Sequence, residues 1–590
     1  MNRINIYTII FLMIFFQNGS AQKKEDTIGT EVVNVVKPYT PAISDAFKIK
    51  ENPPVIEKES TQKEIVKYQI FSFPVASIFV PSKGKAALIE KAKQEKIKPN
   101  YISAAYGNYN TLYSELFISH SIDDTQNIGG TAQYLGSGGG ISGTSLNNGY
   151  EDLLLGGFYD YTFNQNILKV DASYGREGYN WYGLPLKNPN FNFRNVNSIK
   201  PQHIYNTLKA DAELIVAKSF LNKMNIRYIG FSDDYNSSEN RFILNPRFNF
   251  DVNQTNLKLN FNLDYVNTSF DKSFQINVSN QGKDISIQQS SLIFSTHPSI
   301  TFKKDDVSID FGAELTYQAR LKNIYSGIDQ GTQSSFYIYP KIYASYKVVN
   351  DLMVLTTGVE GGLEQQTYQN FVTQNKFFSP TLDAKPSDRQ YALFIGLNGK
   401  LANTVSYHLK SMYESVKNKA LFVSNPYLSN PTENYSYGNS FNVIYDDIKN
   451  FSFFGELKAD VNKDIALGIH ATFNSYQTTN QLEAWNLPVV KIGFLADFTI
   501  GQKFYAGTQL FYVGERKDQF KNYTGFTYPD SVQNVEAYFD INAHLGYKYN
   551  DRWTFFVKAN NLANQNYQRW LNYPVQGTQI IGGASYKFDL

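Results

Sequence analysis

Residues 551–570 read DRWTFFVKANNLANQNYQRW, and residues 578–590 read TQIIGGASYKFDL. In the first segment an apolar face alternates with a polar one, with Phe556 as the exception: Trp553, Phe555, Val557 and Ala559 against Thr554, Lys558 and Asn560. The second segment continues the pattern, with Ile580, Gly582, Ala584, Tyr586, Phe588 and Leu590 against Gly583, Ser585, Lys587 and Asp589. This alternation predicts two strands whose faces meet different surroundings. They fit either the last hairpin of a soluble β-sandwich or the closing strands of a transmembrane barrel, whose backbone groups must all be paired.

The composition favours one large barrel over several soluble domains. The 590 residues include 43 Tyr and 44 Phe but 4 Trp, and 42% of residues are hydrophobic. Transmembrane barrels show this balance because half of each strand faces water. Cysteine is absent, which excludes disulfides, thiol catalysis and cysteine metal sites. The net charge of +2 gives no indication of nucleic acid as a partner.

The first 21 residues predict a signal peptide, removed after Ala21. Arg3 supplies the positive charge, and the apolar residues 6–16 are too few to span a bilayer. Residues 22–100 differ from the rest, because prolines between Pro38 and Pro54 interrupt regular structure and so short a segment buries no large core. We expect an N-terminal extension that packs on the barrel, partly fills its lumen or lies in the periplasm.

Residues 101–590 are a succession of alternating segments, clearest at residues 306–320. There Val307 and every second residue up to Ala319 are apolar, and most residues between them are polar. Polar faces of this kind predict that six charged side chains line a lumen: Lys258, Asp264, Glu314, Arg320, Lys341 and Lys347. Their mixed signs predict a polar interior and not a selectivity filter of one sign. Pro246 and Pro340 count against their strands unless each lies at a bulge or above the membrane.

Ten short polar turns alternate with longer, irregular loops. The turns lie at residues 123–124, 164–166, 219–222, 253–256, 304–306, 350–351, 402–403, 462–464, 501–502 and 550–551. Short turns at one end and long loops at the other are typical of outer-membrane barrels. With both termini in the periplasm, ten inner turns imply eleven outer connections and a transmembrane antiparallel β-barrel of about 22 strands. A propeller, the soluble alternative, would show a blade repeat, and we find none.

The end of the chain resembles a known family. Residues 560–567, NNLANQNY, are similar to the Asn-Leu-x-Asp/Asn-x-x-Tyr signature that precedes the last strand of TonB-dependent receptors, and GASYKF resembles their closing strand. The resemblance covers residues 101–590 and implies an outer-membrane receptor that takes up a solute. Receptors of this family also carry a plug domain ahead of the barrel, which residues 22–100 are too short to form and do not resemble.

The family's TonB box, an N-terminal segment captured by strand addition to the energising protein TonB, has one candidate here. It comprises Glu31, Val32, Val33, Val35 and Val36. The same β-prone run also fits a short strand or a linker. Without a plug there is nothing obvious for TonB to pull. TonB is therefore one candidate partner, beside other envelope proteins and the lipid of the outer membrane.

No residue pattern indicates an enzyme, a cofactor or a metal site. The six histidines are scattered, and His203, His408 and His544 lie on polar strand faces, which predicts structural roles toward the lumen. Residues 136–140 are rich in glycine but precede no helix, so they predict a loop tip and not a phosphate site. The long loops carry aromatics that fit either recognition of a solute or partner, or the girdle at the membrane interface: Tyr179, Trp181, Tyr182, Tyr427, Tyr435 and Tyr437.

Two functions fit this interpretation. The first is a transport barrel of the TonB-dependent receptor type, which takes up an unknown solute through its lumen in the bacterial outer membrane. The second is a non-transporting scaffold or accessory subunit of an outer-membrane assembly or secretion complex, which the missing plug favours. An open 22-stranded pore would be too wide for the cell to tolerate, so the extension, infolded loops or a partner must close it. What fills the lumen decides between the two.

Overall fold

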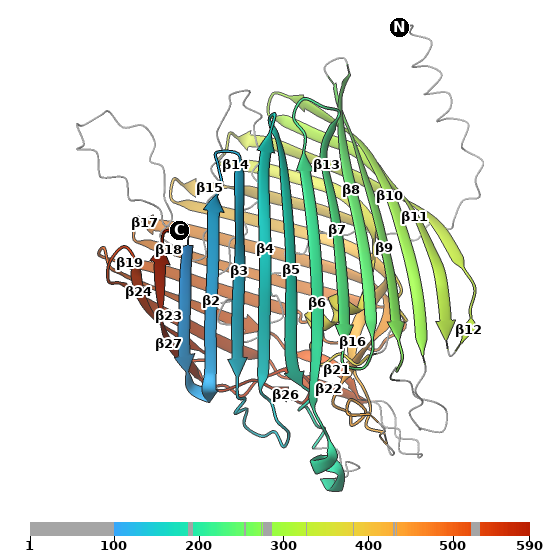
Figure 1. The fold of residues 1–590 in the computed structure, drawn as a ribbon. Helices are drawn as coiled ribbons and strands as arrows, with labels where there is room; N and C mark the ends of the chain where they lie inside the picture. Colours follow the sequence, from blue (N-terminus) through green and yellow to red (C-terminus); the bar gives the residue numbers. More distant parts are fainter. Residues whose placement is uncertain are drawn as a thin grey trace.

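The computed structural model describes residues 100–590 except 187–192, 253–254, 273, 275–285, 326, 381–382, 429–430, 432 and 521–530. The predicted signal peptide, the extension up to residue 99 and the candidate TonB box lie outside the described residues. The described chain forms a closed antiparallel β-barrel (Figure 1). The prediction of an all-β transmembrane barrel is therefore confirmed.

The main sheet contains 23 strands, of which the short β12 (Ile328–Asp329) pairs with β11 alone, so that 22 strands form the wall. The predicted number is therefore confirmed. The wall strands are β1 (Asn100–Gly107), β2 (Thr111–Ser121), β3 (Gln126–Ser137), β4 (Tyr150–Phe163), β5 (Asn166–Asn180), β6 (Gln202–Ile215), β7 (Leu221–Asp233), β8 (Ser238–Val252), β9 (Thr255–Phe270), β10 (Ile287–Lys304), β11 (Val307–Tyr325), β13 (Gln333–Val349), β14 (Met353–Glu364), β15 (Ser387–Ala402), β16 (Val405–Ser424), β17 (Phe441–Asn462), β18 (Ile465–Thr478), β19 (Val490–Ile500), β20 (Phe504–Val513), β23 (Tyr538–Lys548), β24 (Trp553–Asn560) and β27 (Gln579–Phe588).

Smaller elements lie at the outer end of the wall. They are the 3-10 helices η2 (Asn108–Asn110) and η3 (Phe193–Ser198), the α-helix α2 (Tyr368–Gln374), and the hairpins β21 (Arg516–Phe520) with β22 (Ser531–Val535) and β25 (Gln568–Trp570) with β26 (Tyr573–Pro574). In the part of the chain that the structure describes, no helix has the length and apolar character needed to cross a membrane.

The barrel closes between the first and the last strand. β1 pairs with β27 from Asn100 opposite Phe588 to Gly107 opposite Ile581, so the wall has no free edge. The alternation in the last hairpin is confirmed, and Phe556 is explained by the register. Phe556 faces the lumen opposite Gly583 and is 4% exposed, and a Cβ at residue 583 would lie 2.7 Å from its ring.

The two ends of the barrel differ as the turn count predicts. The predicted turns join consecutive wall strands at one end of the barrel, and the loops gather at the other end (Figure 1). One part of the prediction is wrong, because not every outer connection is long. β1 and β2 are joined by the three residues of η2, and β7 and β8 by residues 234–237.

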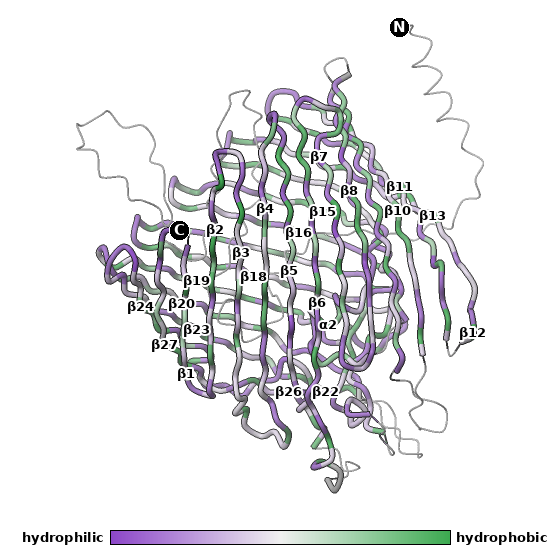
Figure 2. Tube along the Cα trace, viewed as in Figure 1, coloured by the Kyte–Doolittle hydropathy of each residue, from purple (hydrophilic) through white to green (hydrophobic). Residues whose placement is uncertain are grey.

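The two faces of the wall meet different solvents. Apolar residues alternate with polar ones along the strands (Figure 2). The apolar side chains lie on the exposed outer face, as in Phe311 (57% exposed) and Phe555 (46% exposed). Near the turns, outward rings stack as Tyr159, Tyr161 and Phe163 do, with centroids 6.4 and 5.1 Å apart. Such rings form the aromatic girdle of a membrane interface.

Both questioned prolines lie where pairing is interrupted. Pro340 is opposite Ala313 of β11, but the pairing of β13 with β14 begins only at Lys341. Pro246 lies in a gap of the pairing between β8 and β9. Since neither nitrogen has to donate to the ladder on the interrupted side, the strands tolerate both prolines.

Candidate functional site

Loops at the outer end of the barrel fold inward and share one aromatic core. The loop between β14 and β15 contributes Tyr368, Phe371, Val372 and Phe378, each at most 1% exposed. They pack with inward-facing wall residues and with a second loop through Tyr205, Phe231, Phe270, Ile287, Phe422, Phe441 and Tyr573. We call the described residues that connect β5 to β6, β14 to β15, β16 to β17, β20 to β23 and β24 to β27 the outer lid. Aromatic burial of this extent stabilises the lid in its inward position.

The helix α2 in the lid is attached to a wall strand five positions from β14. The side chain of Thr367 caps the helix by accepting from the Asn370 backbone at 3.1 Å. The Glu239 carboxylate of β8 accepts from the backbone nitrogens of Tyr368 at 2.7 Å and Gln369 at 3.1 Å. A carboxylate at this position satisfies N–H groups that the first helical turn leaves free.

A second contact involves the side chain of Tyr368. Its hydroxyl donates to Oδ2 of Asp233 at 2.7 Å. Burial and the neighbouring carboxylate raise the pKa of Tyr368 well above its ordinary value, so the hydroxyl remains a donor. The helix is thus attached to β7 and β8, although its loop starts from β14.

The returning arm of the same loop is bound by β10 and β11. Gln289 accepts from the Ala384 backbone at 3.2 Å and donates to Asp383 at 3.1 Å. Arg320 donates to the Ala384 carbonyl at 3.1 Å and lies 3.6 Å from the Asp383 carboxylate. Arg320 was predicted to line the lumen, and it does so by binding a loop.

Five of the six predicted recognition aromatics lie within the lid, and Tyr179 lies in β5 next to it. Tyr179, Trp181 and Tyr435 are 6%, 1% and 1% exposed, so the assumption that they are exposed is wrong for these three. Trp181 stacks on His203 at 4.0 Å and meets Tyr435 edge-on at 5.5 Å. The other three also take part in lid packing: Tyr182, whose hydroxyl donates to the Pro574 carbonyl at 2.8 Å, and Tyr427 and Tyr437 beside Leu184 and Ile199. A role in recognition stays a prediction.

All six predicted lumen charges lie on the inward face, and each has an oppositely charged neighbour. The pairs are Lys258 with Asp310 at 3.9 Å, Asp264 with Arg241 at 2.5 Å, Lys341 with Glu314 at 3.1 Å, Lys347 with Asp351 at 2.8 Å and Arg320 with Asp383 at 3.6 Å. Arg241 holds Asp264 through two nitrogens, a geometry that the sequence did not reveal. Two of these pairs, Asp264 with Arg241 and Lys341 with Glu314, therefore cross-link neighbouring strands.

The histidines of the lumen wall are structural in their contacts. His203 is 1% exposed, and its Nε2 lies 2.9 Å from the Lys376 carbonyl of the lid. His408 and His544 face inward, opposite Asn398 and Lys558. Within the described ranges no group of three His, Asp or Glu side chains could hold a metal ion.

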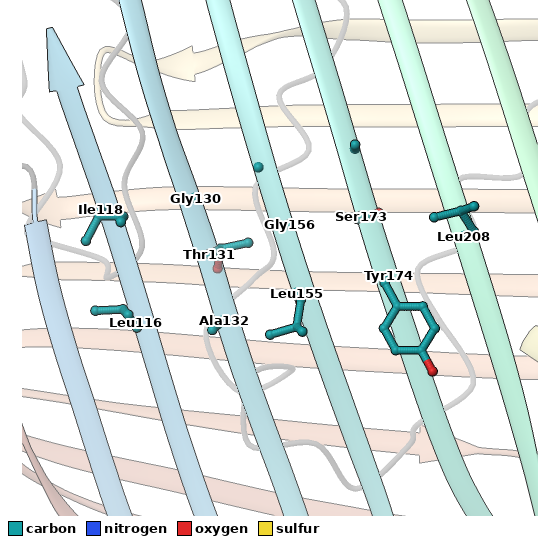
Figure 3. Close-up of a pocket in the computed structure, with 12 residues that line it drawn as sticks. Leu116, Ile118, Gly130, Thr131, Ala132, Leu155, Gly156, Ser173, Tyr174 and Leu208 are labelled. Atoms are coloured by element: carbon teal, nitrogen blue, oxygen red, sulfur yellow. The ribbon is translucent and has the colours of Figure 1, made fainter.

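A shallow groove of about 500 Å³ lies on the outside of the wall, across β2 to β6 (Figure 3). Small residues such as Gly130, Gly157 and Ala172 form its floor, between Leu155 and Leu208. The outward positions of Leu155 and Leu208, which are 44% and 51% exposed, place the groove against the bilayer. It is therefore not a site for a polar solute in the lumen.

The family-like motif near the end of the chain shapes the last outer loop. Asn561 has a φ of 47° and donates to the carbonyls of Gln565 at 2.9 Å and Gln576 at 2.8 Å. Tyr567 stacks on Tyr538 of β23 with centroids 4.0 Å apart. Asparagine tolerates this left-handed backbone because its short side chain bonds locally. The motif therefore shapes the backbone of the last outer loop.

Several solved β-barrel structures are similar to this one. The chain has the barrel fold of iron and siderophore receptors. The ferric-catecholate import receptor Fiu from E. coli matches with a TM-score of 0.60 at 10% identity, over 83% of this chain and 81% of that chain. The FrpB iron transporter from Neisseria meningitidis matches with a TM-score of 0.62 at 10% identity, over 83% and 82%. The siderophore receptor PiuA from Acinetobacter baumannii matches with a TM-score of 0.59 at 10% identity, over the same shares.

These matches show a shared β-barrel fold. The three proteins are named as receptors or transporters, and none as an enzyme. No protein-family model and no curated protein sequence matches the chain.

Proposed function

We propose that the protein is a transport barrel that takes up a solute from outside the cell through its lumen, with the outer lid closing the pathway at rest. The observation that carries this proposal is the contrast between the lumen wall and the lid. The wall is lined with polar and paired charged groups, whereas the outer mouth is covered by loops docked through hydrogen bonds and aromatic contacts. A polar passage with a non-covalent cover suits a pathway that opens and closes.

The comparisons support this class of function. Fiu, FrpB and PiuA are named as an import receptor, an iron transporter and a siderophore receptor. We infer that the barrel of this chain serves uptake in the same general manner. Residues 31–36 are the proposed TonB box, and residues 22–100 the proposed extension that partly fills the lumen from the periplasm.

One observation favours the alternative, a scaffold or accessory subunit of an outer-membrane complex. The buried rings of Tyr179, Trp181 and Tyr435 leave the lid with a packed interior in place of an aromatic binding surface. A scaffold needs such a closed mouth and no opening step.

The test compares a strain lacking the gene with strains that carry either the wild-type gene or one lacking residues 31–36. Growth is measured on a panel of single iron, carbon and nitrogen sources. Transport predicts that at least one source supports growth only with the wild-type gene, and that the deletion of residues 31–36 removes this growth. Equal growth of all strains, together with stoichiometric co-purification of other envelope proteins, contradicts the transport proposal and supports the scaffold.

A further inference from the structure

One segment of the lid spans part of the outer mouth. Residues 365–380 leave the wall at β14 and reach β7 and β8, from which β14 is separated by β9, β10, β11 and β13. On this path Tyr368 packs against Phe231 of β7 and Phe270 of β9, with ring centroids 5.3 and 5.0 Å away. A segment attached to wall strands this far apart covers the part of the mouth between them.

Glu239 makes the polar attachment of the first helical turn to β8. One carboxylate oxygen accepts from the Tyr368 backbone and from Thr268 Oγ1 of β9 at 3.0 Å, and the other accepts from the Gln369 backbone. Glu239 is 2% exposed, so water does not replace these bonds in the closed arrangement. Hydrogen bonds to a buried charge are stronger than those between neutral groups, and losing them leaves the charge unsatisfied.

The attached helix cannot form alone. α2 has seven residues, far below the ~12–15 that an isolated helix needs in water. Its first turn is ordered by the Thr367 cap and by Glu239. Loss of the wall contact therefore unfolds the helix as well as detaching it, which makes the segment a two-state element.

We propose that residues 365–380 form an inhibitory gate in the outer mouth, and that Glu239 of β8 is the latch that holds the gate closed. The proposal rests on the proposed transport function and adds its regulation. A solute or partner that competes for the N-terminal turn of α2, or that wedges Tyr368 away from Phe231, releases the segment and opens the lumen. Glu239 is a positioning residue, because it acts through the helix.

The test uses the full-length protein reconstituted in planar lipid bilayers, with ionic conductance as the readout. In Glu239→Gln the side chain keeps its size but loses its charge and one acceptor oxygen. We expect the open fraction to rise about 10-fold or more, as the loss of one charged hydrogen bond predicts. Tyr368→Phe removes the hydroxyl's bonds with Asp233 and Tyr205 but leaves the bonds of Glu239 to the helix backbone, so it should raise the open fraction less. Glu213→Gln is the matched control, because Glu213 pairs with Lys223 within the wall at 2.7 Å and contacts no lid residue.

A further variant separates failure of the latch from failure of transport. In it, residues 366–380 are replaced by a short Gly-Ser linker. If this variant conducts while Glu239→Gln and Tyr368→Phe remain closed, the latch is overturned and the pathway stands. If none of the variants conducts, even after deletion of residues 22–100, the lumen is not a pathway, and both proposals are overturned. Equal conductance of Glu239→Gln and Glu213→Gln also overturns the latch. Heat-modifiable migration of each variant in electrophoresis verifies that the barrel is folded.

Discussion

The lid end and the turn end of the barrel belong to the same 22 strands, but they are held in place by different kinds of contact. At the turn end, connections of two to five residues join strands that are neighbours in sequence. At the lid end, 24 residues separate Val513 from Tyr538, and contacts such as that of Glu239 with Tyr368 join residues 129 positions apart. Local chain geometry therefore determines the turn end, whereas long-range packing determines the lid end. Each prediction below tests that difference.

The largest effect is expected in the aromatic core of the lid. Phe378 is fully buried, so Phe378→Ala should reduce the free energy that protects the lid by about 3–5 kcal/mol. Hydrogen exchange followed by mass spectrometry measures this protection for lid and turn peptides separately. The turn peptides should not change. A parallel loss of protection at both ends would show that the two ends are not independent.

Near the middle of the wall, the pair of Arg241 and Asp264 should come next. Its side chains are 16% and 9% exposed, so Asp264→Ala leaves a mostly buried guanidinium without its carboxylate. We expect a loss of about 3 kcal/mol in the free energy of unfolding, measured by urea titration in lipid vesicles. If replacing both residues by Leu lowers the free energy of unfolding as much as Asp264→Ala alone, the unpaired charge is not the cause of the destabilisation.

The response to pH should have opposite signs at the two ends. Burial raises the pKa of Asp518 in the lid to about 6, whereas hydrogen bonds from Thr125 hold the pKa of Asp123 in a turn below its usual range. Because the folded lid binds a proton that the unfolded chain releases between pH 4 and pH 6, lid stability should fall over that interval by about 3 kcal/mol. The lowered pKa of Asp123 stabilises its turn at pH values above the pKa of an unfolded aspartate. This stabilisation is lost as the pH falls through the pKa that Asp123 has in the folded protein.

Hydrogen exchange at pH 5 and pH 7.5, corrected for intrinsic rates, measures the effect on the lid. Lid peptides should be better protected at pH 5. Asp518→Asn should remove this difference between the two pH values, and its persistence in the variant would assign it to another group.

The smallest effect is expected at the turn end. Lys347 and Asp351 are 2.8 Å apart, but the aspartate side chain is 80% exposed. Because exposed ion pairs contribute little, Asp351→Ala should change the free energy of unfolding by less than about 1 kcal/mol in the same urea titration. If Asp351→Ala lowers the free energy of unfolding as much as Asp264→Ala does, ion pairs at the turn end and in the lumen contribute equally to stability.

The sequence predicted the wall well because its information is local. The period of two in residues 306–320 indicates which side chains face the lipid, and the same period placed Lys258, Asp264 and Lys341 on the lumen face. The count of ten turns gave the number of strands. Phe556, the one exception in the final hairpin, was not explained until the register placed it opposite Gly583.

The lid was not predicted, because its contacts join residues that are far apart in the sequence. Nothing near Tyr368 in the sequence indicates Glu239 or Asp233 as its partners, and residues 365–380 have no period that reveals where they dock. Tyr179, Trp181 and Tyr435 were taken as exposed because loops usually lie at the surface. Inside a wide barrel the loops can fold inward, which buries these rings. The TonB box at residues 31–36 and the extension at residues 22–100 stay predictions.

The sequence alone determined that this chain is a closed barrel with an apolar outside and a polar inside, because the bilayer imposes a strict alternation and requires every backbone group to be paired. Only the tertiary structure decided what covers the outer mouth. That choice depends on which distant side chains meet across the lumen, such as the carboxylate of Glu239 and the first turn of α2. Contacts of this kind leave no periodic signal in the chain, since they form only once the wall has brought the strands around.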